Sequence, residues 1–164
     1  MRNPLFLVPL AVGTIGFASF FIHPFGAVRA QRSNSPLLAN AAITPAAAKV
    51  LERSCQNCHS ERTTWPWYSY LPPVSWLIED DVQGARSHMN LSHWEAYTAA
   101  QQIEILTKIG VEVRNRRMPL PKYLQLHPEA KLSNEDVQDL SAWAHDERRR
   151  LKNQSGSKPQ FPTD

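Results

Sequence analysis

The chain has 164 residues, the length of one domain, and its 42% hydrophobic and 20% charged residues are typical of a globular protein and exclude a disordered one. The first 30 residues hold two of the 18 basic residues and no acidic residue, so the rest of the chain carries 16 basic against 15 acidic residues. This near-neutral balance excludes the charge of a polyanion-binding protein, and we expect no nucleic-acid partner.

Residues 1–30 contain an uncharged apolar run from 5 to 22. A membrane-spanning helix needs about 17 to 25 such residues and the apolar core of a signal peptide about 7 to 15, so the run favours a membrane anchor or tether. A signal peptide is the alternative, because Val28 and Ala30 occupy the small-residue positions that signal peptidase recognises. Both interpretations export residues 31–164, which we expect on the periplasmic side, membrane-anchored or secreted.

Residues 31–42 have the composition of a short tether, and residues 43–152 contain helical patterns joined by long Pro-rich loops. The first predicted helix begins at Pro45, with Thr44 as its N-cap, and runs into the cysteines. The second runs from Pro73 to about His88. Its apolar residues fall on one helical face, which we expect to be buried: Val74, Leu77, Ile78, Val82 and Ala85.

A third helix, from Thr98 to about Asn115, opens with the spacing of a capping box, and a fourth has the same signal at Ser133 and Asp136. The apolar residues that carry the last helix into the core are Leu140, Trp143, Ala144 and Leu151. No stretch alternates like a β-strand for long, so the sequence predicts an all-α domain. Residues 153–164 are polar and are expected to form a flexible tail.

Both cysteines of the chain lie in "CQNCH", at Cys55 and Cys58, directly before His59. A thiol–disulfide catalyst normally carries C-x-x-C in a thioredoxin-like βαβ unit, which this sequence lacks. A zinc site needs four ligands, and the only pair of suitable spacing is His88 with His93. A disulfide between cysteines three apart closes a very small loop and adds little stability.

Covalent haem attachment uses all three residues of the motif. Thiols at i and i+3 of one helical turn can form thioethers with the two haem vinyl groups, and the following histidine then faces the iron. The sequence therefore predicts one c-type haem, with Cys55 and Cys58 as thioether positions and His59 as the proximal iron ligand. Its other ring nitrogen should donate to a carbonyl, for which the loop at Pro66 or Pro72 is a candidate.

Met118 is the favoured sixth ligand, because it stands in a Pro-rich loop after a helix, 59 residues beyond the proximal histidine. His127 is the chief alternative, also in a loop marked by proline. Met89 ends an apolar stripe and is interpreted as a core residue. Surface or capping roles are expected for His88 and His93.

Several aromatic residues follow the motif closely and are expected to wall the porphyrin: Trp65, Trp67, Tyr68, Tyr70 and Trp76. Trp76 is predicted to bind the cofactor in this way. Arg62, Arg86 and Tyr123 are weaker candidates for contact with the haem propionates, and a solvated side chain is the favoured interpretation for each. Of the three, Tyr123 is included among the predicted cofactor-binding residues.

The chain resembles the small bacterial haem-binding domain proteins related to c-type cytochromes. The resemblance covers about residues 43–146, and four segments carry it: "CQNCHS" with "WPWYSYLPPVSWL", "DDVQGARSHMNLSHW", "RRMPLPKYLQLHPEAKLS", and the Trp143 helix. It implies covalent haem, cytochrome c-like helices around it, and electron transfer. Cys55, Cys58 and His59 match the family's attachment motif, and Met118 matches its Met-Pro element.

The resulting hypothesis is an exported monohaem c-type cytochrome that exchanges one electron with unidentified redox partner proteins and needs no substrate chemistry. Two alternatives stay open. A peroxidase-like enzyme would need an open sixth position with a distal acid–base pair, such as His88 or His93 with Arg86. A redox or gas sensor would need a ligand that leaves and an output partner.

Overall fold

A computed structural model describes residues 4–25 and 28–156 of the protein, and these residues form helices and loops without a β-strand. The expected all-α class is confirmed. The α-helices are α1 (Pro4–Ser19), α2 (Pro45–Ser54), α3 (Gln56–His59), α4 (Val74–His88), α5 (Ala99–Arg114), α6 (Pro121–Leu124) and α7 (Asn134–Gly156). Short 3₁₀ helices lie between them: η1 (Val28–Ala30), η2 (Trp67–Tyr70), η3 (Leu91–Ala96) and η4 (Pro128–Ala130).

The helix starts follow the capping signals of the sequence. The Thr44 hydroxyl accepts from the Ala47 N–H at 3.2 Å and begins α2. Thr98 and Gln101 form a complete capping box at the start of α5. At α7 the Asp136 N–H donates to the Ser133 hydroxyl at 3.0 Å, and the Ser133 N–H donates to the Asp136 carboxylate at 2.7 Å. All three predicted starts are confirmed, because a cap depends only on residues three positions apart.

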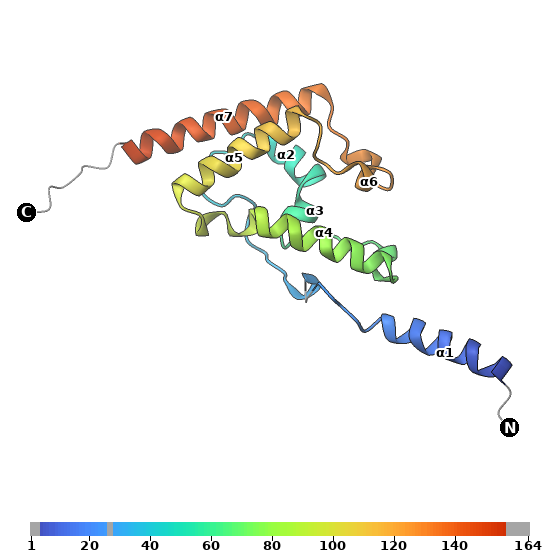
Figure 1. Cartoon of the computed structure of the whole chain (residues 1–164). Coiled ribbons are helices and arrows are strands. Elements are labelled where there is room, and N and C mark those ends of the chain that lie inside the picture. The colour runs from blue at the N-terminus through green and yellow to red at the C-terminus, as the bar shows by residue number, and fades with distance from the viewer. Residues whose placement is uncertain (1–3, 26–27, 157–164) are drawn as a thin grey trace, which may run out of the picture.

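The hydrophobic core lies mainly between α5 and α7, which run side by side, with α2 packed against α7 (Figure 1). Its fully buried members include Leu51, Leu106, Leu140 and Trp143, each at most 2% exposed. Met89 packs against this core as expected. The core therefore closes one side of the domain, and α3 and α4 lie on the other.

The expected burial of the apolar face of α4 is wrong at its N-terminal end. Val74 is 41% exposed and Leu77 is 51% exposed. The buried residues of α4 are instead Ser75, Glu79, Val82 and Arg86. Two of them, Glu79 and Arg86, hydrogen-bond residues 23–31, so a polar stripe is buried against the N-terminal segment.

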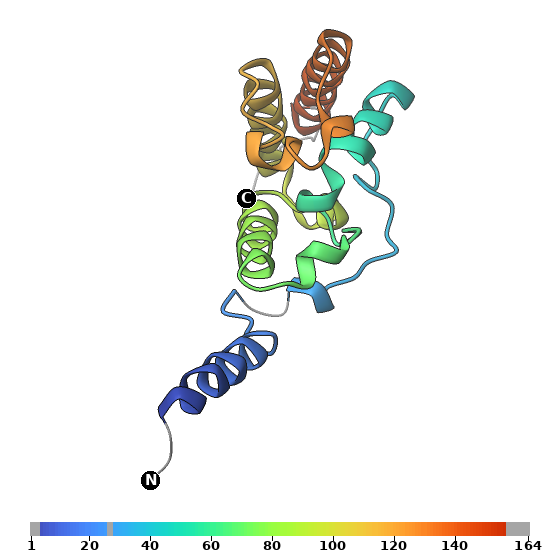
Figure 2. The same cartoon turned by 90° about the vertical axis from the view of Figure 1, so that its right-hand side faces the viewer.

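Helix α1 projects away from the domain, and the chain returns along α4 before it enters α2 (Figures 1 and 2). None of the helices in the described part of the chain has the length and apolar character needed to cross a bilayer. At the other end α7 continues to Gly156, so the expected boundary of the tail at 153 falls inside this helix. Residues 157–164 of that tail lie outside the described part of the chain.

Candidate functional site

The two cysteines and His59 lie on one short turn between α2 and α4. Cys55 ends α2, and its carbonyl accepts from the N–H groups of Cys58 at 3.3 Å and His59 at 3.0 Å. Both cysteines are free thiols and do not form a disulfide with each other. Helix α3 packs against α4 and α2, so the motif is held by the helices on either side of it.

Both thiols are held in the protonated form. Burial, together with the neighbouring Cys58, raises the pKa of Cys55 from 9.0 to about 12. Burial and the carboxylate of Asp81 raise the pKa of Cys58 to about 11. A thiol–disulfide catalyst needs a lowered thiol pKa, so these cysteines do not have the character of that class.

The imidazole of His59 is oriented by α4. Its Nδ1 lies 3.1 Å from the Ala85 carbonyl oxygen and 3.2 Å from the Met89 carbonyl oxygen. Since a carbonyl only accepts, Nδ1 carries the proton and Nε2 keeps its lone pair for a metal. Burial lowers the pKa of His59, which favours the neutral imidazole that a metal binds. The orienting carbonyl therefore comes from the end of α4, and the expectation of the Pro66 or Pro72 loop is wrong.

The segment from Met118 to His127 lies against this site. Tyr123 on α6 accepts a hydrogen bond from the Asn57 side chain on α3 at 3.1 Å, and Lys122 pairs with Asp81 of α4 at 2.8 Å. Met118 lies in the loop between α5 and α6 and is half-buried. Its role as sixth ligand and the contact of Tyr123 with a propionate stay predictions, but the loop that carries them borders the motif.

His127, the alternative sixth ligand, is fully engaged by protein groups. Its Nε2 lies 2.5 Å from the Tyr68 hydroxyl and its Nδ1 lies 3.0 Å from the Glu129 carboxylate. Its ring also stacks on Tyr123, with 4.3 Å between the ring centroids. Ligation by His127 would break at least one of these contacts.

The aromatic residues expected around the porphyrin contact different parts of the protein. The Trp76 indole N–H donates to the Ile22 carbonyl at 2.8 Å, and its contact with haem stays a prediction. Trp65 and Tyr70 flank the guanidinium of Arg29, which lies 4.4 Å and 4.5 Å from their ring centroids. Tyr68 lies beside His127 instead, so part of this cluster holds the N-terminal segment.

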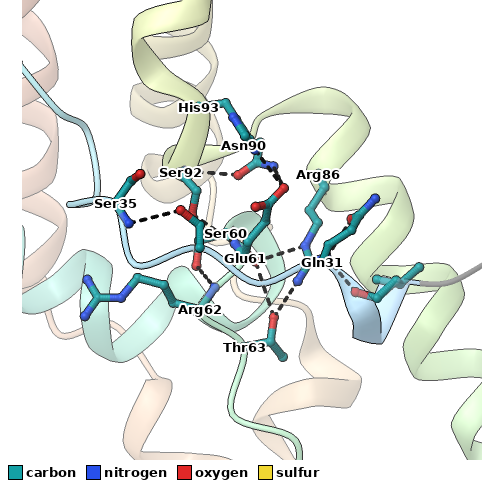
Figure 3. A network of polar contacts seen from close by, with 12 residues as sticks. Gln31, Ser35, Ser60, Glu61, Arg62, Thr63, Arg86, Asn90, Ser92 and His93 are labelled. Carbon is teal, nitrogen blue, oxygen red and sulfur yellow. Dashed lines mark hydrogen bonds and ion pairs between the residues drawn. The ribbon is translucent and has the colours of Figure 1, made fainter.

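Arg86 is the residue whose role the sequence analysis missed. It was expected to be solvated, but it is only 8% exposed and donates four hydrogen bonds (Figure 3). The acceptors are the Ser60 carbonyl at 2.9 Å, the Val28 carbonyl at 2.9 Å, the Gln31 side chain at 2.9 Å and the Thr63 hydroxyl at 3.0 Å. The helical spacing of Glu79, Val82 and Arg86 indicates that they share one face of α4. It does not indicate which segment covers that face.

The histidines expected at the surface are found there. His88 is exposed, and His93 is exposed and pairs with Glu61 at 2.7 Å. In the described part of the chain, no group of three or more histidine, cysteine or acidic side chains is placed to hold a metal ion directly.

The residues present fit haem. Two protonated thiols and a neutral imidazole with a free Nε2 form the donor set of a c-type attachment turn. The exposed Val74 and Leu77 fall on the same face of α4 as Ala85, whose carbonyl holds His59. Asp81 lies between them on this face and pairs with Lys122, so exposed apolar side chains lie at the N-terminal end of the face.

Comparison with known proteins agrees with this chemistry. The chain is 28% identical over 95 residues to the cytochrome c peroxidase Ccp of Escherichia coli (strain K12). The match covers 56% of this chain and 20% of that protein, so the chain spans only a fifth of its length. No solved structure matches the chain. A family model described as a haem-binding domain matches residues 14–146. The protein is therefore a member of the haem-binding domain family.

Proposed function

We propose that this haem-binding protein is an exported c-type cytochrome that carries one haem, bound covalently at Cys55 and Cys58, and transfers single electrons. The observation that carries the proposal is His59, which follows two free thiols and has its Nδ1 fixed by two carbonyls of α4. A histidine that is oriented in this way presents Nε2 as an axial ligand. When bound, haem supplies an iron that alternates between the ferric and ferrous states.

The protein's own residues have three tasks in this proposal. Cys55 and Cys58 would hold the haem through thioether bonds, since adding a thiol S–H across a vinyl C=C is redox-neutral. Desolvation lowers the pKa of His59 and so favours its neutral form, and α4 keeps its ring in place. The exposed apolar side chains of Val74 and Leu77 on α4 would be available to pack against haem and exclude water, which would limit reorganisation on electron transfer.

Met118 completes the proposed ligand set. It is half-buried and lies in the loop that leads into α6, whose Tyr123 contacts Asn57 of the motif, whereas the ring nitrogens of His127 already have partners. A thioether ligand favours ferrous iron and raises the reduction potential. The proposed location is the periplasmic side of the membrane, because c-type attachment is an extracytoplasmic process and residues 5–22 are apolar. The proposed partners are redox proteins that exchange one electron.

Visible absorption of the purified haem protein tests this function. We expect a low-spin ferric spectrum with the methionine–iron charge-transfer band, unchanged by peroxide, and a ferrous spectrum unchanged by CO. A high-spin ferric spectrum that shifts with peroxide would contradict the electron carrier and favour an enzyme.

A peroxidase-like enzyme is the second candidate, and the similarity to cytochrome c peroxidase Ccp favours it. Such an enzyme needs an open iron position beside a distal acid–base pair. Of the residues considered for that pair, Arg86 is buried in its network, His93 pairs with Glu61 at the surface, and His88 is exposed. The electron carrier therefore remains the better supported of the two.

A further inference from the structure

The C-terminal end of α4 contacts the haem-attachment turn from two sides. The backbone carbonyls of Ala85 and Met89 accept from the His59 ring. The Arg86 side chain, between them in sequence, donates to the carbonyl of Ser60, the residue directly after His59. His59 and Ser60 are thus both hydrogen-bonded to the C-terminal end of α4.

Further hydrogen bonds connect Arg86 and its partners to the residues of the C-x-x-C motif. The Thr63 hydroxyl, which accepts from Arg86, donates to the Asn57 carbonyl inside C-x-x-C at 2.6 Å. The Ser60 hydroxyl donates to the Gln56 carbonyl at 2.7 Å. Because Arg86 is 8% exposed and all of its acceptors are protein groups, its geometry is fixed by the fold.

We propose that Arg86 is a positioning residue for the axial ligand: it fixes the turn after His59 and thereby the direction of the imidazole. The inference rests on the proposed role of His59 as a haem ligand. Arg86 itself does not touch the iron. Its loss should leave the attachment chemistry intact and loosen the histidine–iron geometry.

The experiment compares Arg86→Gln and Arg86→Lys with Arg62→Gln, a matched control that removes the charge of an exposed neighbour. For Arg86→Gln we expect covalent haem with a shifted ferric EPR signature and reduction potential. Arg86→Lys should restore the wild-type EPR signature in part. Arg62→Gln should match the wild type. Wild-type EPR and potential in a folded Arg86→Gln protein would overturn the proposal.

A milder variant covers the case in which Arg86→Gln does not fold. Thr63→Val keeps Arg86 and removes one acceptor and the link to Asn57. We expect a smaller shift in the same direction, and wild-type spectra in both Thr63→Val and Arg86→Lys would contradict the positioning role.

Nitrogen-15 NMR of the haem-free full chain tests the same role without the cofactor. Thr63→Val and Arg86→Lys should weaken the preference of His59 for the Nδ1–H tautomer. An unchanged tautomer in both variants would count against the positioning role of Arg86. Failure of the wild-type protein to acquire haem would instead count against the proposed function.

A second inference rests on the buried carboxylate of Glu79, which is 0% exposed. Both of its ion-pair partners come from the N-terminal segment: Arg29 Nε lies 2.6 Å from it and His23 Nδ1 lies 3.1 Å from it. Arg29 also donates to the backbone carbonyl of Ser69. Cleavage after Ala30 would remove both ion-pair partners of Glu79, together with the segment that packs over it.

We infer that residues 22–30 stay attached as part of the mature haem-binding domain, so that the protein is not cut between Ala30 and Gln31. The segment also supplies the Ile22 carbonyl to Trp76 and the Val28 carbonyl to Arg86. The inference goes beyond the proposed function, because it states which residues complete the domain after export.

Two measurements on the full-length protein test it. Intact mass of protein from the exported fraction should exceed that of a chain beginning at Gln31 with one haem attached, and a mature N-terminus at Gln31 would overturn the inference. In the haem-free chain, Arg29→Ala should lower the unfolding midpoint by several degrees, whereas the exposed control Arg32→Ala should not. Equal midpoints for the two variants would also overturn it. Absence of the protein from the exported fraction would count against the proposed location, while the Arg29 comparison would still decide this inference.

Discussion

Cys55, Cys58 and His59 share one physical condition: burial favours the neutral form of each side chain. Neutral thiols do not bind metal ions strongly and do not start disulfide exchange, because both reactions need the thiolate. A neutral imidazole with its proton on Nδ1 is the form that binds iron. The turn is therefore suited to haem and poorly suited to thiol redox catalysis.

The thiol pKa values predict slow alkylation of the haem-free chain. At about pH 8 both thiols should react with iodoacetamide much more slowly than in the urea-unfolded chain, and their rates should rise only as the pH approaches 11 to 12. Because the folded pKa values are raised, the folded state keeps protons that the unfolded state loses above about pH 9. The stability from this effect is complete below about pH 9 and is lost towards about pH 12. Rapid alkylation of the folded chain at about pH 8 would show that the thiols are not buried.

Met118→Ala should remove the sixth iron ligand. We expect loss of the methionine–iron charge-transfer band and a high-spin ferric spectrum that responds to added imidazole. Met89→Ala is the matched control, because Met89 packs against the core and its backbone carbonyl, which holds His59, is kept. His127→Ala should keep the low-spin spectrum. The reverse pattern, with Met118→Ala unchanged and His127→Ala high-spin, would assign the ligand to His127.

At the scale of elements, α5 begins with a complete capping box. Thr98→Ala should lower the free energy of unfolding by about 1 kcal/mol, because the Gln101 N–H loses its side-chain acceptor. Thr107→Ala, at an exposed position inside the same helix, is the control and should have little effect. Urea unfolding of the haem-free chain measures both, and equal effects would show that the cap does not stabilise α5.

The helices and the attachment turn could be predicted from the sequence because their signals are local. Caps need three residues of spacing, and the C-x-x-C-H motif needs one turn. The buried face of α4 could not be predicted, since Glu79 and Arg86 find partners about 50 residues away along the chain. The carbonyls that orient His59 were missed for the same reason: they lie 26 and 30 residues away.

At the scale of the whole molecule, the main core between α5 and α7 lies on the other side of the domain from α4 (Figure 1). Leu140→Ala, at a fully buried position on α7, should lower the free energy of unfolding by about 2 to 5 kcal/mol. The visible spectrum of the folded haem protein should remain that of the wild type. A changed axial-ligand spectrum in Leu140→Ala would show that this core and the haem site are not separate.

The central claim is that one haem is bound covalently to this chain through Cys55 and Cys58. Intact mass under denaturing conditions tests it most directly, on protein produced in a host with cytochrome c maturation machinery. We predict the mass of the polypeptide plus one haem, together with the pyridine-haemochrome band of two thioether bonds, and loss of both in Cys55→Ala/Cys58→Ala. A wild-type polypeptide with no added mass, from which any haem is extracted by acid and organic solvent, would contradict the account.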